Sequence, residues 1–120
     1  MRRLAVLSGV MGMMVIGTAA FANSPYGLWT RPSNGTQVNF YNCGGKLCAK
    51  VVKSQTKANE GKVIMSGAEK SSANTWKGNL LNLDNGQTYT GVVTLEGPKA
   101  LKLQGCVLGG MICTGETWVK

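Results

Sequence analysis

Histidine is absent from this chain of 120 residues, and acidic residues are scarce, with 5 Asp and Glu against 13 Lys and Arg. Without imidazole the chain cannot build a Ser-His-Asp triad, a Cys-His nucleophile pair or a histidine metal site. A glycosidase needs two carboxylates facing one cleft. The spacing of the acidic residues brings no two of them together: Glu60, Glu69, Asp84, Glu96 and Glu116. We therefore expect a protein that is not an enzyme, with no catalytic residues, no metal and no cofactor.

Long apolar runs are also lacking, with one exception at the N-terminus. Arg2 and Arg3 precede an apolar stretch over residues 4–17, and Ala20-Phe21-Ala22 then supplies the small residues of a cleavage site. This layout is that of a secretory signal peptide, so we expect residues 1–22 to be cleaved rather than retained as a membrane anchor. The mature chain, 23–120, keeps eleven basic and five acidic residues, a net charge of +6. No second run of spanning length follows, which predicts a periplasmic protein with no stable membrane span after cleavage.

Cysteine occurs four times, in two close pairs, Cys43 with Cys48 and Cys106 with Cys113. An even count in a small exported domain indicates disulfides. A zinc site made from all four thiolates is the alternative, but these spacings exceed those of common zinc knuckles and an oxidising compartment favours the disulfide. Neither pair has the Cys-x-x-Cys spacing of a thiol-exchange protein.

The mature chain alternates apolar and polar residues in short runs that are separated by Gly, Asn, Asp, Ser and Pro. This pattern predicts a single all-β domain over 23–120. The expected strands are 27–31, 36–42, 47–54, 62–66, 75–83, 87–95, 99–106 and 112–119. The stretch 55–74 is polar and predicts only a short strand near 63–65 between two mobile loops.

Alternation also assigns the faces of the strands. The residues that we expect to point inward are Val38, Phe40, Leu47, Ala49, Val51, Leu101 and Leu103, because their neighbours are polar. Each strand then has one buried and one solvated face, as in antiparallel sheets. About eight such strands with short connections most simply form an antiparallel meander closed into a barrel, and a two-sheet sandwich is the alternative. The interior of so small a barrel is filled by side chains or holds one small ligand.

The predicted strand count bears on the disulfide pairing. In a meander, successive loops alternate between the two ends of the barrel. The loop between Cys43 and Cys48 is the second connection and the loop between Cys106 and Cys113 the seventh, so the two pairs lie at opposite ends. We therefore predict two local disulfides, each closing one hairpin. If 62–66 were not a strand, the order of the ends would change and pairing between the two loops would become feasible.

A series of motifs runs through the mature chain: Gly27-Leu28-Trp29-Thr30, Asn42-Cys43-Gly44-Gly45-Lys46-Leu47-Cys48, Trp76-Lys77-Gly78, Asn85-Gly86-Gln87-Thr88-Tyr89, Leu101-Lys102-Leu103-Gln104-Gly105-Cys106 and Thr117-Trp118-Val119-Lys120. In content and order they resemble the DUF2147 domain family, small exported bacterial proteins of unknown function. The resemblance implies export and a compact β fold, and it brings no known activity. The Gly-x-Trp of the first strand is also similar to that of lipocalin-like and avidin-like barrels.

The chain departs from the family pattern at several positions. Asn82-Leu83 stands where the family usually has Asp-Pro, and Asn79 where it has glycine. Gln104 and Lys120 occupy positions at which the family favours arginine. If those aspartate or arginine positions carry a family function, we expect it to be weakened in this chain.

Aromatic residues are few, and four of them form a candidate ligand-binding cluster: Trp29, Trp76, Tyr89 and Trp118. The structural interpretation is that Trp29 on the first strand and Trp118 on the last meet as the barrel closes and plug one end, because large aromatic side chains dominate small cores. The functional interpretation is an aromatic-lined cup for a small apolar or sugar ligand.

The basic residues are spread along the mature chain without a dense block, which is typical of a solvated surface. Five lysines nevertheless cluster on the second hairpin and the loop that follows: Lys46, Lys50, Lys53, Lys57 and Lys62. Such a ridge would attract an anionic component of the cell envelope, with an affinity that falls as salt rises. Export and the lack of interleaved aromatic and basic residues argue against nucleic acid as a partner.

Two functions remain. The first is a periplasmic binding module that holds a small ligand in the barrel or an anionic envelope component on the lysine ridge. The second is a structural or interaction protein of the envelope that engages another protein through its loops or a sheet edge. An internal cavity open at one end would favour the first, and a fully packed barrel would favour the second.

Overall fold

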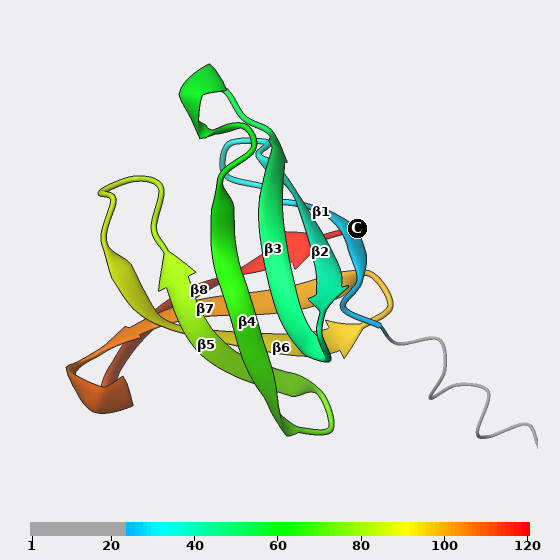
Figure 1. Cartoon of the computed structure of the whole chain (residues 1–120), viewed down its shortest axis with the longest axis vertical. Helices are drawn as coiled ribbons and strands as arrows, with labels where there is room; N and C mark the ends of the chain where they lie inside the picture. Colours follow the sequence, from blue (N-terminus) through cyan, green and yellow to red (C-terminus); the bar gives the residue numbers. More distant parts are fainter. Residues whose placement is uncertain (1–23) are drawn as a thin grey trace, which may run out of the picture.

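The computed structural model describes residues 24–120, which form a single barrel of eight antiparallel strands (Figure 1). The proposed signal peptide, 1–22, lies outside the described residues. The strands are β1 (Gly27–Thr30), β2 (Gln37–Cys43), β3 (Lys46–Lys53), β4 (Val63–Ser72), β5 (Thr75–Leu81), β6 (Thr88–Gly97), β7 (Ala100–Val107) and β8 (Ile112–Val119), with short 3-10 turns η2 (Lys57–Asn59) and η3 (Leu108–Gly110). No helix in the described part of the chain has the length and apolarity needed to cross a bilayer.

Each strand pairs with the next in sequence, and β8 returns to β1, which confirms the predicted closed meander. Because the direction alternates, the β1–β2, β3–β4, β5–β6 and β7–β8 connections gather at one end, which we call the cavity end. The β2–β3, β4–β5 and β6–β7 hairpins lie at the other end, together with the start of β1 and the end of β8. We call this the closed end. All eight strands and both disulfides fall within residues 27–120, so the barrel is complete without residues 1–22.

One strand is much longer than predicted. The sequence pattern indicated 62–66, whereas β4 continues to Ser72. Gly67 has a φ of +113°, and the ladder shifts register there, so that Ala68 is again turned inward and fully buried. Beyond it, the side chains from Glu69 to Ser72 are exposed on both faces, because the β4–β5 hairpin extends past the barrel. The loop predicted after residue 66 was therefore wrong, because most of it belongs to β4. A strand that is polar on both faces shows no alternation of apolar and polar residues, so the sequence did not reveal it.

The core confirms the face assignment. The predicted inward residues Val38, Phe40, Leu47, Ala49, Val51, Leu101 and Leu103 are all buried, together with Trp29, Met65, Trp76, Val93 and Trp118. Strands β5 and β6 approach closely at Gly91, where an added Cβ would lie 2.6 Å from the Cβ of Leu80 and 3.0 Å from the Cε of Met65. A glycine is needed there because these inward side chains fill the space.

The disulfides join Cys43 to Cys48 across the β2–β3 hairpin and Cys106 to Cys113 across the β7–β8 hairpin. This local pairing confirms the prediction from loop order. The first disulfide lies at the closed end of the barrel and the second at the cavity end.

Candidate functional site

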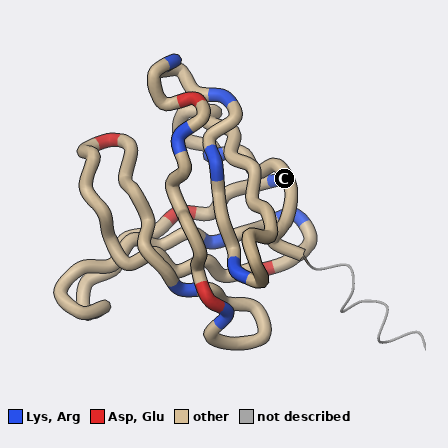
Figure 2. The backbone as a smooth tube through the Cα atoms, viewed as in Figure 1, with Lys and Arg blue, Asp and Glu red and all other residues tan. Residues whose placement is uncertain are grey.

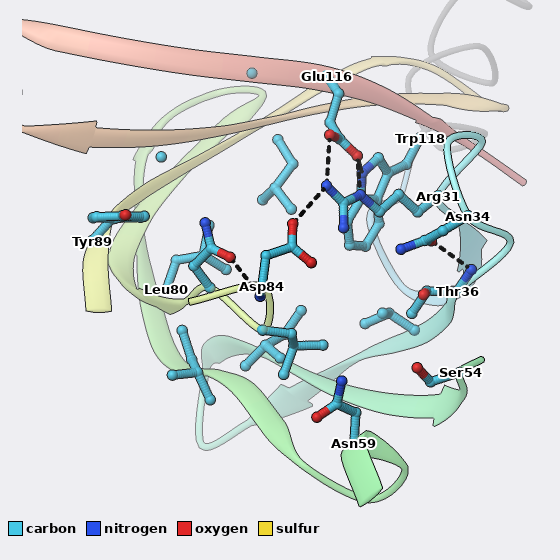
Figure 3. A pocket seen from close by; sticks show the side chains of 18 of the residues that line it. Arg31, Asn34, Thr36, Ser54, Asn59, Leu80, Asp84, Tyr89, Glu116 and Trp118 are labelled. Carbon is cyan, nitrogen blue, oxygen red and sulfur yellow. Dashed lines mark hydrogen bonds and ion pairs between the residues drawn. The ribbon is translucent and has the colours of Figure 1, made fainter. Parts of the chain in front are cut away.

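The barrel is packed over only part of its length. At the cavity end, a hollow of about 410 Å³ opens between the loops and reaches down to core side chains (Figure 3). Its apolar wall is made by inward-facing residues of five strands: Val38, Ile64, Leu80, Leu103 and Trp118. The rest of the core, including Trp29, Phe40, Met65 and Leu101, fills the closed end. The volume lies within the range of small-molecule sites, about 300–1,000 Å³.

The rim of the cavity is polar, and most of its side chains are neutral; the charged ones are Arg31, Asp84 and Glu116. Three connections supply it, and their amide and hydroxyl side chains are Asn34, Thr36, Ser54, Gln55, Thr56, Asn59 and Asn82. Several of these side chains also shape the loops that carry them: the amide oxygen of Asn34 accepts from the backbone N–H of Thr36 at 3.0 Å, and that of Asn82 from the N–H of Asp84 at 2.8 Å. The rim can therefore offer neutral hydrogen-bonding groups to a ligand whose apolar part lies below.

Arg31 is the only cation in the cavity wall of the described chain. Its Nε and Nη2 donate to the two carboxylate oxygens of Glu116 at 2.5 and 3.1 Å, and Nη2 also lies 3.5 Å from a carboxylate oxygen of Asp84. The indole N–H of Trp118 donates to Glu116 at 2.8 Å. Burial alone would raise the pKa of Glu116, but the hydrogen bonds from Arg31 and Trp118 and the charge of Arg31 outweigh it and lower the pKa.

These contacts cross a weak seam of the barrel. Strands β1 and β8 share a single residue pair, Thr30 with Val119, so most of β8 has no strand on that side. Arg31 follows directly after β1, while Glu116 is on β8 and Asp84 in the β5–β6 connection. The guanidinium of Arg31 thus links the end of β1 to β8 and to the β5–β6 connection at the cavity rim, where β1 and β8 are not joined by backbone hydrogen bonds.

A second irregularity faces the opposite side of the cavity. The β4–β5 ladder has no pairs before Met65, since its first match is Met65 with Leu80. A shallower hollow of about 300 Å³ lies on the surface there, and two residues, Ile64 and Leu81, line both it and the main cavity.

The expectation that no two carboxylates come together was wrong. Asp84 and Glu116, 32 positions apart in the chain, both line the cavity and both contact Arg31. Only the fold brings them together, so their spacing carried no signal. A general acid needs a raised pKa, whereas that of Glu116 is lowered. Within residues 24–120 no three Cys, Asp or Glu side chains gather as a metal site would require.

The structure separates the four residues of the aromatic cluster. Trp118 and Tyr89 line the cavity, whereas Trp29 and Trp76 do not. Trp29 is fully buried, donates its indole N–H to the carbonyl of Pro25 at 2.8 Å and has the Nζ of Lys120 5.1 Å from its ring centroid. Trp118 packs edge-to-face on Phe40, with ring centroids 6.3 Å apart.

The five lysines of the ridge are exposed and follow β3 from one end of the barrel to the other (Figure 2). Lys46 at the closed end lies 3.4 Å from the carboxylate of Glu69. Lys53 ends β3 at the cavity end, and Lys57 and Lys62 belong to the β3–β4 connection that follows. The ridge therefore has two parts, and the second part stands beside the cavity mouth.

The residues that reasoning from the sequence missed are those of the rim. Arg31 stands at the end of an expected strand, Asn34 and Asp84 lie between expected strands, and Asn59 lies in the polar stretch 55–74, so none of them stood out as a site residue. Their shared feature is a position in alternate connections of a meander, which places them at one end of a barrel. Once the strand order is known, the sequence therefore shows which connections lie at the cavity end.

A family model described as an uncharacterized protein conserved in bacteria, DUF2147, matches residues 27–120, the whole barrel. The chain belongs to this family. No curated protein matches the chain. Among solved structures, protein HP1028 of Helicobacter pylori, described as belonging to the lipocalin family, is similar with a TM-score of 0.62 and 17% identity over 78% of this chain and 79% of that one. A redesigned β-barrel is similar with a TM-score of 0.54 and 18% identity over 85% and 94%. At these identities the likeness concerns the fold, which is a lipocalin-like barrel.

Proposed function

We propose that this member of the DUF2147 family is a non-enzymatic binding protein that holds a small amphipathic ligand in the open half of its barrel. The observation that supports this most is the cavity itself, with an apolar wall of core side chains below a rim of neutral amides and hydroxyls. An apolar pocket with a few convergent polar groups is the usual form of a small-molecule site. The description of HP1028 as a lipocalin agrees with such a use of the fold.

The electrostatics of the wall indicate what the polar part of the ligand is like. Arg31 is already paired with Glu116 and Asp84, so one cation faces two carboxylates. An anionic group placed there would have to displace these partners. We therefore expect a ligand with an alkyl or ring portion and an uncharged hydrogen-bonding head, such as a monoacylglycerol, to bind better than a fatty acid of the same chain length.

The test is a titration with a long-chain monoacylglycerol, in which displacement of a polarity-sensitive dye reports binding. Two variants on the same strand provide the comparison. Thr114 lines the cavity on β8, and Thr117 lies three positions later on the same strand and is exposed outside the cavity. Thr114→Trp should weaken binding by about tenfold or more, because an indole fills the mouth, while Thr117→Trp should bind like the wild type. Absence of saturable binding, or equal binding by both variants, would refute the proposal.

Export to the periplasm is part of the same proposal. It rests on the N-terminal sequence pattern and on the two disulfides, which persist in oxidising compartments. Cell fractionation followed by N-terminal sequencing tests it. The expected mature protein begins at Asn23 and is found in the periplasmic fraction, and an intact Met1 in the cytoplasmic fraction would contradict export.

One observation favours the alternative, an interaction protein of the envelope. Strand β8 spans Ile112–Val119 but pairs with β1 at only one residue, so its outer edge is open to an added strand. In that case the amides of β8 should become protected from hydrogen exchange in the presence of the envelope partner captured by crosslinking in cells. Protection that is unchanged with every captured protein would dismiss this alternative.

A further inference from the structure

The tip of the β7–β8 hairpin is an exposed apolar surface. Its four large side chains, Val107, Leu108, Met111 and Ile112, are exposed by 40, 68, 85 and 53%. Only Gly109 and Gly110 separate the two pairs. We call these six residues the apolar tip. Apolar side chains exposed together in this way mark an interaction surface, whereas scattered single ones need no explanation.

Two features of the hairpin that carries the apolar tip are unusual. Within residues 24–120, Leu108 is the one non-glycine residue with a positive φ, +53°. A turn that served only to reverse the chain would carry glycine or asparagine at such a position. Directly beneath the tip, Cys106 and Cys113 face each other across the two strands and form a disulfide. A strained leucine presented to solvent on a crosslinked hairpin indicates a role for that side chain outside the barrel.

Charge is arranged around the cavity end in a complementary way. The chain carries no charged residue between Lys102 and Glu116, so the apolar tip is free of charge. On the other side of the mouth, Lys53 at the end of β3 and Lys57 and Lys62 in the β3–β4 connection are exposed to solvent. The one acidic residue of that connection is Glu60. By the strand order both connections belong to the cavity end; in Figure 1 the β3–β4 connection projects at the top and the β7–β8 hairpin at the lower left.

We propose that the cavity end docks on a lipid bilayer, with the apolar tip inserted among the acyl chains and the three lysines against anionic headgroups. An uncharged apolar tip combined with basic side chains across the mouth at the same end of the barrel fits the layered structure of a membrane surface. This deepens the proposed function and rests on it for one consequence: docking turns the cavity mouth toward the bilayer, so the ligand would be an amphiphile taken from or delivered to that bilayer.

The test is cosedimentation of residues 23–120 with vesicles of phosphatidylcholine alone or mixed with phosphatidylglycerol. A double variant, Leu108→Asn with Met111→Ser, removes the two most exposed side chains and leaves a residue that tolerates the left-handed conformation. The control is Leu28→Ser, which removes another exposed leucine, 42% exposed, from the outer face of β1. A third variant replaces Lys53, Lys57 and Lys62 with glutamine.

The double variant should lose binding to both kinds of vesicle by about tenfold or more, and the control should bind like the wild type. The glutamine variant should lose only the gain conferred by phosphatidylglycerol, the part that high salt also removes. Wild-type binding by the double variant, or no binding of the wild type to either vesicle, would overturn docking. So would a dimer in sedimentation velocity that the double variant abolishes, since the tip would then serve self-association. Dye displacement by the monoacylglycerol should be unchanged in the double variant, so failure of docking and failure of the cavity are told apart.

Discussion

Leu101 and Leu103 offer a direct test of how far the barrel is packed. Both are on β7, both point inward, and they are two positions apart. Leu101 is fully buried within the packed closed end, whereas Leu103 is in the cavity wall. Truncation of each to alanine removes the same atoms, so any difference in the free energy of unfolding reflects the surroundings.

The two losses should differ by a predictable amount. In a closely packed site, Leu→Ala costs the transfer of the lost carbons plus the cavity left behind, about 3–5 kcal/mol. At Leu103 the space already exists, so only the transfer contribution remains, about 2 kcal/mol for three carbons. We therefore expect Leu101→Ala to be the more destabilising change by about 1–3 kcal/mol. A small domain has a total stability of about 5–15 kcal/mol, so both variants should still fold.

Urea unfolding of the oxidised protein, followed by tryptophan fluorescence, measures both values, with the midpoint compared at a shared slope. Leu101→Ala should leave monoacylglycerol binding unchanged, while Leu103→Ala should alter the preferred length of the ligand. Equal losses of stability, or a larger loss for Leu103→Ala, would mean that the interior is packed throughout and that Leu103 lines no cavity.

Three further predictions concern the stability of the barrel. Because the pKa of Glu116 is lowered in the folded state, its contribution is complete above the unfolded value of 4.5 and is lost as pH falls through the lower, folded pKa. Glu116→Gln should therefore cost about 1 kcal/mol at pH 7 and flatten the acid limb of a stability-against-pH curve, and an unchanged acid limb would contradict the ion pair. Replacing Cys43 and Cys48 with serine opens a loop of sequence separation 5 and should lower the free energy of unfolding in urea by about 2 kcal/mol; no loss would show that the disulfide adds nothing. Gly91→Ala should lower the thermal midpoint by the equivalent of about 1–3 kcal/mol, while Gly97→Ala on the same strand, where nothing lies within 4 Å of the added Cβ, should be close to neutral. Equal effects of the two alanines would exclude a close approach at Gly91.

The strand pattern could be predicted because most strands bury one face. Val38, Phe40, Leu101 and Leu103 alternate with polar neighbours. This alternation predicts both that the segment is a strand and which of its side chains point inward. The disulfide pairing followed from the strand order alone. The second half of β4 could not be predicted, because its side chains from Glu69 onward are solvated on both faces and their pairing with β5 leaves no pattern.

The cavity could be predicted only as an option. Whether a barrel of this size is filled depends on how far its inward side chains extend across the interior. The alternation of apolar and polar residues shows which side chains point inward, but it does not show how far they extend. Arg31 and Glu116 are 85 positions apart, and they meet because β8 returns to lie beside β1 when the barrel closes. Sequence spacing cannot report a contact made by barrel closure. The apolar tip lies, except for Ile112, in the connection between the expected strands 99–106 and 112–119, and nothing in the pattern indicated that its side chains would face solvent.

In the proposed function, a small amphipathic molecule occupies the open half of the barrel. Amide chemical-shift mapping during titration with a long-chain monoacylglycerol tests it most directly, because it locates the ligand as well as detecting it. We expect saturable shifts at Ile64, Leu103 and Trp118 around the cavity, and little change at Leu47 and Leu95 in the packed half. No saturable shift, or shifts confined to the outer faces of the strands, would contradict it.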